Sequence, residues 1–240
     1  MLWATGCSST YGDDLQDKTQ AWPYLLANML DLECVNNAVS GGSNERIVYQ
    51  TVKSSPCKFK VIAWSRIERI TRYDPENNFE VNFNPQLSHE LYENDYAFKE
   101  YGKLHYGKWY NDLYAFKSWL QQIILLQKYL DNQQQSYIML NAGHNRYSRY
   151  VTDWKNFNNS VKDLVCFDKM TDDQLYAEHC EIQQYIDLID TRRYYNIQDF
   201  YITQLCEKYP TGKTGHLLEE AQQEIAKRLY PLCSNLIHSQ

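Results

Sequence analysis

The chain has 240 residues, of which 43% are hydrophobic and 22% charged, and its formal net charge is -6. This length can bury a sizeable core, and we expect a single domain over residues 1–240. The acidic balance disfavours a general binder of phosphate backbones, so nucleic acid is not an expected partner. The sequence has no apolar run of about 18 residues and no basic region followed by an apolar core at the N-terminus. We therefore expect no membrane contact, no cleaved signal and a cytoplasmic location.

Cysteine and histidine usage gives no sign of a metal site. The seven cysteines form no CxxC pair, and the six histidines are dispersed without ligand spacing. Scattered thiols fit a reducing compartment better than a disulfide framework. We expect neither a metal nor another cofactor. The 21 tyrosines could line a carbohydrate-binding or protein-binding surface, although half-buried packing is their commoner use.

The N-terminal stretch predicts a strand, a tight turn and a helix. Residues 2–5 are apolar, the run breaks at Gly6, and a helical pattern resumes after Gly12 and continues to Met29. A hydroxyl residue in such a turn stands at the carboxyl end of a strand, where open α/β sheets bind their ligands. Ser8 is therefore the candidate nucleophile. The alternative is that the small residues after Gly6 only cap the following helix.

Two further strands are predicted to end in small polar residues. Residues 32–39 form the second, which ends in Gly41 and Gly42 before a helix that starts at Asn44, and residues 58–65 form the third. A parallel sheet with helical crossovers brings these ends to one edge. Alone, the glycines are also explained by a plain turn and Asn44 by a plain cap.

The third strand ends in Trp64 and Ser65, followed by Arg66 and Arg69 on either side of Glu68. An ion pair with Glu68 accounts for at least one of the two arginines. Trp64 and Arg69 are candidates for substrate contact, because they follow a strand end at the predicted open edge.

Residues 71–110 are predicted to be an aromatic-rich insertion with short helices. Turn residues alternate with aromatic ones, and connections of this length are often lids or binding loops. We favour a role in shaping the substrate cleft over an oligomer contact.

The clearest helix covers residues 112–130, and residues 136–142 form a fourth strand. His144 follows that strand at the same predicted edge, although a surface or hydrogen-bonded histidine is the commoner case. Residues 154–165 suggest a helix and 182–189 a short element.

The last unit is a loop rich in proline and glycine over residues 209–215. It presents His216 immediately before an amphipathic helix that covers residues 217–229. A histidine at a helix start, far in sequence from a nucleophile on the first turn, is one way in which an α/β hydrolase assembles its base.

Two segments in the first fifth of the chain resemble sequence blocks of the SGNH (GDSL-like) hydrolases. The chain as a whole is similar to the short, phage-encoded members of that family. Residues 6–12, Gly-Cys-Ser-Ser-Thr-Tyr-Gly, resemble the first block, Gly-Asp-Ser-x-Thr-x-Gly, with Cys7 in place of the aspartate. Residues 36–42 resemble the second block, whose glycine N–H helps to bind the oxyanion. Gly41 matches that glycine.

The other two blocks are incomplete. Ser65 stands where the third block, Gly-x-Asn-Asp, has its oxyanion asparagine, so either Ser65 or the nearby Asn44 would be that donor. His216 matches the histidine of the last block, Asp-x-x-His, but Lys213 replaces the acid. The resemblance implies a three-layer α/β/α fold with a flavodoxin-like parallel sheet of about five strands.

The resemblance also implies acyl transfer. Ser8 would attack an ester carbonyl, His216 would transfer the proton, and the N–H groups of Ser8 and Gly41, with Ser65 or Asn44, would form the oxyanion hole. Without the family acid, the imidazole would be oriented by a backbone carbonyl in a Ser-His dyad, our working hypothesis, or by a carboxylate from elsewhere in the chain.

The expected partner is a small-molecule or glycan ester, with an O-acetylated carbohydrate favoured over long-chain lipids because aromatic faces stack on sugar rings. The competing hypothesis is a non-catalytic SGNH-like domain that binds or builds a larger assembly, such as a homo-oligomer or a virion. A phage-encoded chain would then reside in the host cytoplasm or the virion. A phosphate-binding loop at residues 40–43 lacks the required Lys-Ser/Thr ending.

Overall fold

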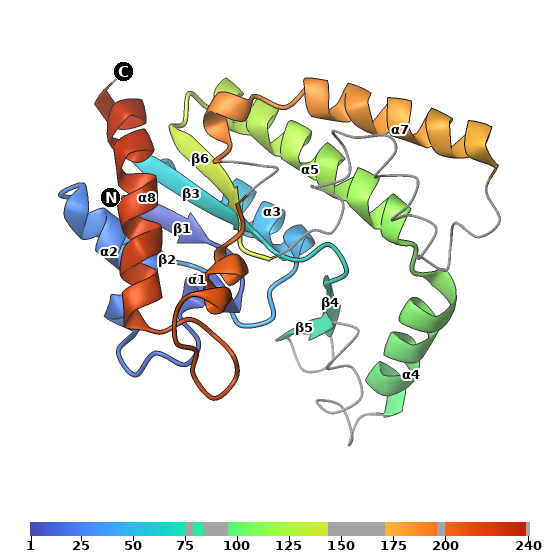
Figure 1. The fold of residues 1–240 in the computed structure, drawn as a ribbon, viewed down its shortest axis with the longest axis horizontal. Coiled ribbons are helices and arrows are strands. Elements are labelled where there is room, and N and C mark those ends of the chain that lie inside the picture. Colours follow the sequence, from blue (N-terminus) through green and yellow to red (C-terminus); the bar gives the residue numbers. More distant parts are fainter. Residues whose placement is uncertain (75–78, 84–95, 144–170, 196–199, 239–240) are drawn as a thin grey trace.

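The computed structural model describes residues 1–74, 79–83, 96–143, 171–195 and 200–238 (Figure 1). Its main sheet has four parallel strands within these ranges, in the order β2-β1-β3-β6. The strands are β1 (Leu2–Thr5), β2 (Cys34–Asn36), β3 (Phe59–Trp64) and β6 (Tyr137–Asn141). In the sheet's own numbering this order is 2-1-3-4, as in flavodoxin-like folds. The predicted α/β class with a flavodoxin-like parallel sheet is confirmed.

An extended segment lies beside β6 at the position of a fifth strand. Tyr194 and Tyr201 form parallel bridges with Met139 and Asn141. The backbone N–H of Tyr195 donates to the Met139 carbonyl at 2.7 Å. The sheet therefore continues past β6 through single bridges on either side of residues 196–199, which lie outside the described ranges.

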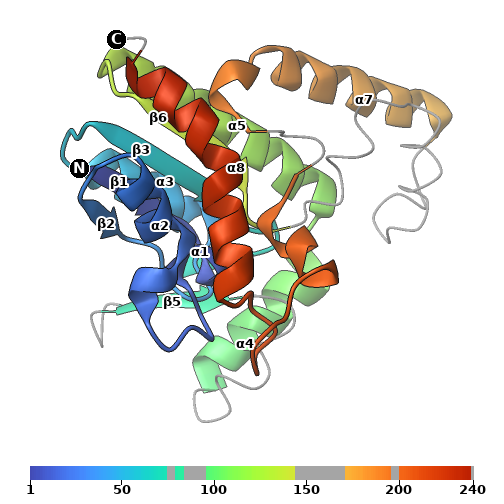
Figure 2. The ribbon, with the colours of Figure 1, turned by 60° about the vertical axis from the view of Figure 1, so that its left-hand side comes forward.

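Helices cover both faces of the sheet, which gives the predicted three layers. On one face α2 (Trp22–Met29) and α8 (Glu219–His238) lie side by side, as Figure 2 shows. On the other face lie α3 (Asn44–Lys53) and α5 (Asp112–Asn132), and α7 (Asp172–Asp187) packs against α5. A helix near the N-terminus and the C-terminal helix thus share one layer.

Alternation along β3 explains why both faces are covered. All six residues of the strand are buried, as expected for a parallel strand between two helical layers. Three side chains join the cluster under α2 and α8: Phe59, Val61 and Ala63. Ile62 and Trp64 face α3 and α5 instead. The continuous apolar run in the sequence is therefore a central strand.

The helix expected between Gly12 and Met29 is wrong in its first half. Gly12 has a φ of +87° and ends the short helix α1 (Ser8–Tyr11), and Asp14 is also left-handed at φ +67°. A 3-10 turn, η1 (Lys18–Gln20), follows, and the helix proper begins only at Trp22 with Pro23 in its first turn. Two left-handed residues separated by one position cannot belong to a right-handed helix, so the chain loops out before α2.

The insertion at residues 71–110 contains a hairpin that was not predicted. Strands β4 (Ile70–Asp74) and β5 (Phe79–Phe83) pair antiparallel. The predicted short helices are present as α4 (Tyr96–Leu104) and a π-helical turn, η2 (His105–Trp109). Figure 1 shows the hairpin and α4 beyond the carboxyl ends of β1 and β3.

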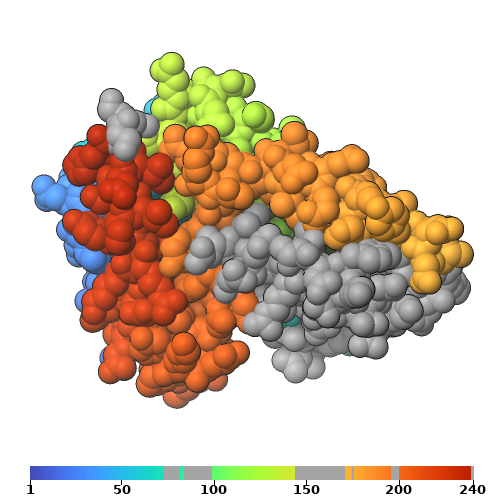
Figure 3. All heavy atoms as spheres, turned by 45° about the horizontal axis from the view of Figure 1, so that its top comes forward, coloured from blue at the N-terminus to red at the C-terminus, as the bar shows by residue number. Residues whose placement is uncertain are grey.

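The C-terminal half agrees with the sequence in most of its elements. The strand and long helix expected at 136–142 and 112–130 are β6 and α5, whereas α8 continues past Pro231 to His238. Before α8 come two 3-10 helices, η4 (Thr191–Arg193) and η5 (Ile202–Glu207). Figure 3 shows these segments and α8, in orange and red, side by side on one face of the molecule. His144 and the helix expected at 154–165 lie outside the described residues.

No helix within the described ranges is long and apolar enough to cross a membrane. The six described cysteines are free thiols. In the same part of the chain, no group of three or more histidine, cysteine or acidic residues is arranged to hold a metal ion.

Candidate active site

The strand order defines one place where the sheet opens. The chain leaves β1 toward β2 on one side and returns to β3 on the other, so the carboxyl ends of β1 and β3 form the switch point at which such sheets bind ligands. Ser8 follows β1, Gly41 follows β2 and Ser65 follows β3. Three sequence-predicted residues thus stand after adjacent strands at one edge.

Ser8 is the first residue of α1, with only 4% of its surface exposed. Its carbonyl accepts from the N–H groups of Gly12 and Asp13, at 2.9 and 3.1 Å. Gly6 permits this turn, because a Cβ at that position would lie 2.4 Å from the Thr10 hydroxyl oxygen. The tight turn predicted before Ser8 therefore depends on a glycine for steric reasons.

The second turn packs directly on the first. The Val39 N–H donates to the Gly6 carbonyl at 3.3 Å, and a Cβ at Gly42 would lie 3.1 Å from the same oxygen. Gly41 has a φ of +72°, a conformation that favours glycine. Among the described residues, its N–H takes part in no hydrogen bond. This N–H therefore remains free to donate in the turn after β2.

The third turn is tied to the second by one side chain. The Asn44 carboxamide accepts from the Ser65 N–H at 2.7 Å and donates to the Ser65 carbonyl at 3.2 Å. Asn44 and Ser65 are both buried, so this pair fixes the spacing of the two turns. The second hydrogen of the Asn44 amide and the hydroxyl hydrogen of Ser65 are not used in this pair. The alternative between these two oxyanion donors stays open.

Of the two residues expected to contact substrate, one lies in the core and the other lies beside the third turn. Trp64 is fully buried in the core between the sheet and α5, so its assignment as a substrate contact is wrong. Arg69 is half-buried, and its Nη1 donates to the Ser65 hydroxyl oxygen at 3.2 Å. The expected ion pair with Glu68 is made by Arg66. Arg69 therefore lies beside the third turn.

His216 lies in a closed loop just before α8. The Gly212 N–H donates to the His216 carbonyl at 2.8 Å, and Thr211 bridges Leu217 in antiparallel fashion. The backbone N–H of His216 donates to the Asp14 carboxylate at 3.1 Å. A residue of the first loop thus holds the loop that carries the candidate base.

Asp14 receives two further hydrogen bonds from the same loop. The Thr214 N–H and hydroxyl donate to its Oδ2 at 2.9 and 2.8 Å. The Thr214 oxygen is also 2.8 Å from Nδ1 of His216, which is 3.7 Å from Asp14 Oδ2. Burial raises the pKa of the Asp14 carboxyl, but these hydrogen bonds outweigh it and lower the pKa below its usual value of 3.8.

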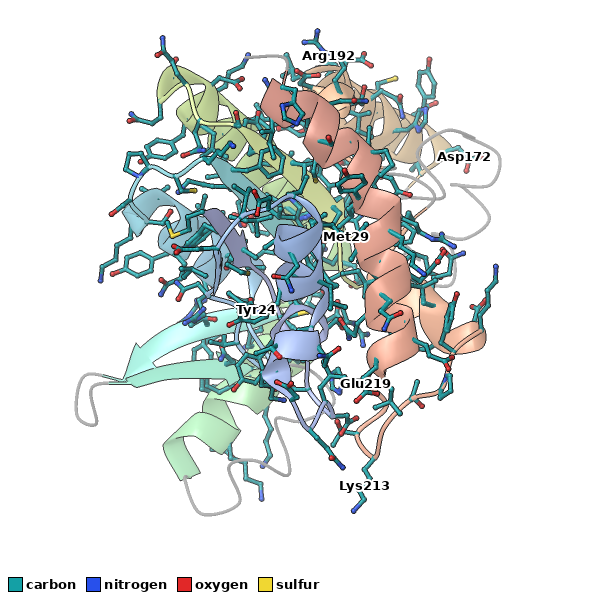
Figure 4. The ribbon with its side chains drawn as sticks, turned by 90° about the vertical axis from the view of Figure 1, so that its left-hand side faces the viewer. Tyr24, Met29, Asp172, Arg192, Lys213 and Glu219 are labelled. Carbon is teal, nitrogen blue, oxygen red and sulfur yellow. The ribbon has the colours of Figure 1, made fainter. Side chains whose placement is uncertain are left out.

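Asp14 is the residue that sequence reasoning missed. The motif places the acid at Lys213, and Figure 4 shows that Lys213 points outward from the tip of the loop. Asp14 precedes His216 by 202 residues and belongs to no recognised block. Two consecutive acids after Gly12 were the available signal, but only the folded chain connects them to the histidine.

The structure brings the first turn and the His216 loop together through Asp13 and Asp14. The N–H of Asp13 bonds to the Ser8 carbonyl, and the next residue, Asp14, holds the loop. Within the described ranges, no hydrogen bond joins the Ser8 hydroxyl to the His216 ring. Catalytic hydrogen bonds in unliganded enzymes are often long and shorten when substrate binds.

The sequence model of a family of unknown function, DUF6071, matches residues 9–152. The chain belongs to this family. The DUF6071 match contains the second and third turns and ends before the His216 loop. A search of curated proteins finds no match.

One solved structure that resembles this DUF6071 protein is described as "a putative lipolytic protein of G-D-S-L family from Desulfitobacterium hafniense DCB-2". The two chains are 9% identical, with a TM-score of 0.42, and the alignment covers 96% of this chain and 98% of the other. At this degree of likeness, the fold assignment rests on the strand order and layers described above.

Proposed function

We propose that this protein is a serine hydrolase of acyl esters, with Ser8 as nucleophile and His216 as general base. The observation that carries the proposal is the hydrogen-bonded connection between the switch-point turn of Ser8 and the His216 loop, made through Asp14. A structural cap after β1 would not require the His216 loop, from the other end of the chain, to be anchored next to it by Asp14. The resemblance to SGNH hydrolases at residues 6–12 and at His216 supports the same assignment.

The chemistry divides ester hydrolysis into two steps. The Ser8 oxygen forms a bond to the acyl carbon while His216 takes its proton, and that proton then goes to the departing alcohol. Water next attacks the acyl carbon while His216 takes a proton from it, and His216 gives this proton to the Ser8 oxygen as the acyl–serine bond breaks and the carboxylic acid leaves. The free N–H of Gly41 and the N–H of Ser8, with Ser65 or Asn44, would hold the negatively charged oxygen in both steps.

We further propose a short acyl group, with an acetylated carbohydrate as the substrate class. The β4–β5 hairpin lies next to the second turn, since a Cβ at Gly41 would lie at an ordinary contact distance of 3.6 Å from that of Asn82. The Thr71 hydroxyl contacts Ser43 at 2.7 Å and donates to Asn82 at 2.6 Å. This polar hairpin beside Gly41 fits a polar leaving group better than a long acyl chain.

The first experiment is labelling with a fluorophosphonate probe, followed by assays on nitrophenyl acetate and acetylated sugars. We expect the wild-type protein to be labelled at Ser8 and to hydrolyse acetyl esters. Ser8→Ala should abolish both, whereas Ser9→Ala, one residue further along α1, should retain them. His216→Ala should lower activity by a factor on the order of 10² or more, and the exposed His238→Ala should not.

Absence of labelling and of hydrolysis in the wild-type protein would overturn the hydrolase assignment. The non-catalytic alternative, a binding or structural domain of a larger assembly, would then be favoured. Labelling at a serine other than Ser8 would keep a hydrolase but reject this site.

A further inference from the structure

The hydroxyl of Thr214 lies between a carboxylate and an imidazole. It donates to Asp14 Oδ2 at 2.8 Å, and its oxygen is 2.8 Å from His216 Nδ1. A direct contact between Nδ1 and Asp14 is too long for a hydrogen bond at 3.7 Å. The carboxylate therefore reaches the ring through one intervening hydroxyl group.

Proton counting fixes the direction of these hydrogen bonds. An ionised Asp14 only accepts, so the single hydroxyl proton of Thr214 is used in the bond to Oδ2. The Thr214 oxygen can then only accept from the ring, which requires a proton on Nδ1 of His216. The neutral imidazole consequently has its lone pair on Nε2.

The backbone at Gly212 and at Asp14 is adapted to this contact. A Cβ on Gly212 would lie 2.3 Å from the Cβ of Asp14 and 2.7 Å from its Oδ2, so the loop closes on the carboxylate only with glycine at this position. Asp14 itself is held at φ +67°, a left-handed conformation that is unfavourable for most residues other than glycine. Strain of this kind persists where surrounding contacts determine the conformation.

We propose that Asp14 and Thr214 are positioning residues that orient His216 through a carboxylate–hydroxyl–imidazole chain and present Nε2 as the base. The inference rests on the proposed function, because it gives His216 the tautomer that proton transfer from Ser8 requires. Asp14 thereby takes the place of the acid that the Lys213 position lacks.

The test replaces the hydroxyl without changing the shape of the side chain. Thr214→Val removes the hydroxyl, Thr214→Ser keeps it, and the outward-pointing Lys213→Ala in the same loop is the matched control. Nitrogen NMR of histidine-labelled protein reads the His216 tautomer without any substrate. Wild type, Thr214→Ser and Lys213→Ala should have the proton on Nδ1, whereas Thr214→Val should lose that preference.

Kinetics give the second measurement. Thr214→Val should lower kcat for acetyl ester hydrolysis by at least about tenfold with little change in KM, because the chemical step and not binding is affected. Thr214→Ser and Lys213→Ala should stay within about threefold of wild type. Asp14→Asn should weaken the same step, and its folding is checked by circular dichroism.

The outcomes separate this inference from the proposed function. An active enzyme in which Thr214→Val keeps both the tautomer and kcat would overturn the positioning role and leave the hydrolase intact. A proton on Nε2 in the wild-type protein would also overturn it. An inactive wild type with the Nδ1 tautomer, lost in Thr214→Val, would preserve the chain of contacts but reject the hydrolase.

Discussion

At the scale of single residues, one carboxylate contacts the His216 loop from a position other than the one where the motif has its acid. Asp14 accepts three hydrogen bonds from Thr214 and His216, although the motif points to position 213. All three donors reach a single oxygen, Oδ2, so the negative charge is concentrated where the loop closes. The local contacts therefore depend on Asp14 being ionised.

This dependence predicts how stability changes in acid. The folded-state pKa of Asp14 lies below 3.8, so the unfolded chain binds its proton first as the pH falls. The stabilisation from the ionised Asp14 carboxylate is complete above pH 3.8, and it is lost as the pH falls through the folded-state pKa. In urea unfolding, the stability difference between wild type and Asp14→Asn should be largest at neutral pH and shrink below pH 3.8. If the stability difference between wild type and Asp14→Asn stayed constant down to pH 2, the ionised Asp14 carboxylate would not be what stabilises this loop.

At the scale of elements, side-chain amides hold together segments that the main chain leaves separate. Asn44, at the start of α3, is bonded at both ends to the backbone of Ser65 after β3. Gln222 in α8 accepts from the Trp22 N–H and donates to the Leu217 carbonyl, which joins α8 to the start of α2. These contacts position the turns of the candidate site against one another.

Asn44→Ala should destabilise the protein by about 1–3 kcal/mol, because it leaves the buried N–H and carbonyl of Ser65 without partners. The control is Asn37→Ala, whose amide makes one bond to Gln50 at a half-buried position. That change should cost about 0.5 kcal/mol. Chemical denaturation measures both, and equal losses in the two variants would reject a special role for the Asn44 amide.

At the scale of the whole molecule, the C-terminal helix completes a core that the N-terminal elements begin. Ile225 of α8 is fully buried in one cluster with Leu2 of β1 and Trp22 and Leu26 of α2. Because His216 lies in the loop that leads into α8, the packing of this helix also positions the candidate base. The two ends of the chain therefore contribute to the same core and the same site.

Ile225→Ala should lower the free energy of unfolding by about 2–5 kcal/mol, as expected for truncating a fully buried aliphatic side chain. The matched control on the same helix is Leu232→Ala. Leu232 has 37% of its surface exposed, so its truncation should cost less than about 1 kcal/mol. Thermal and urea unfolding by circular dichroism measure both. A small effect of Ile225→Ala would mean that α8 is not integral to the fold.

Local sequence determined the parallel strands, the long helix α5 and the glycine turns at Gly6 and Gly41, because periodicity and the need for small residues act over short distances. It did not determine that Trp64 is a core residue, since a strand's last side chain points to either face depending on register. The hairpin at residues 70–83 was missed because turn residues and aromatic side chains concealed the strand pattern.

The sequence by itself predicted the four strands of the main sheet, the helices α3, α5 and α8, and the candidate pair Ser8 and His216, whose roles stay predictions. Only the tertiary structure decided which carboxylate meets the histidine, because Asp14 and His216 are separated by 202 residues and no local pattern encodes their distance. That contact arises from the packing of α8 beside α2, which brings the loop before one helix against the loop before the other.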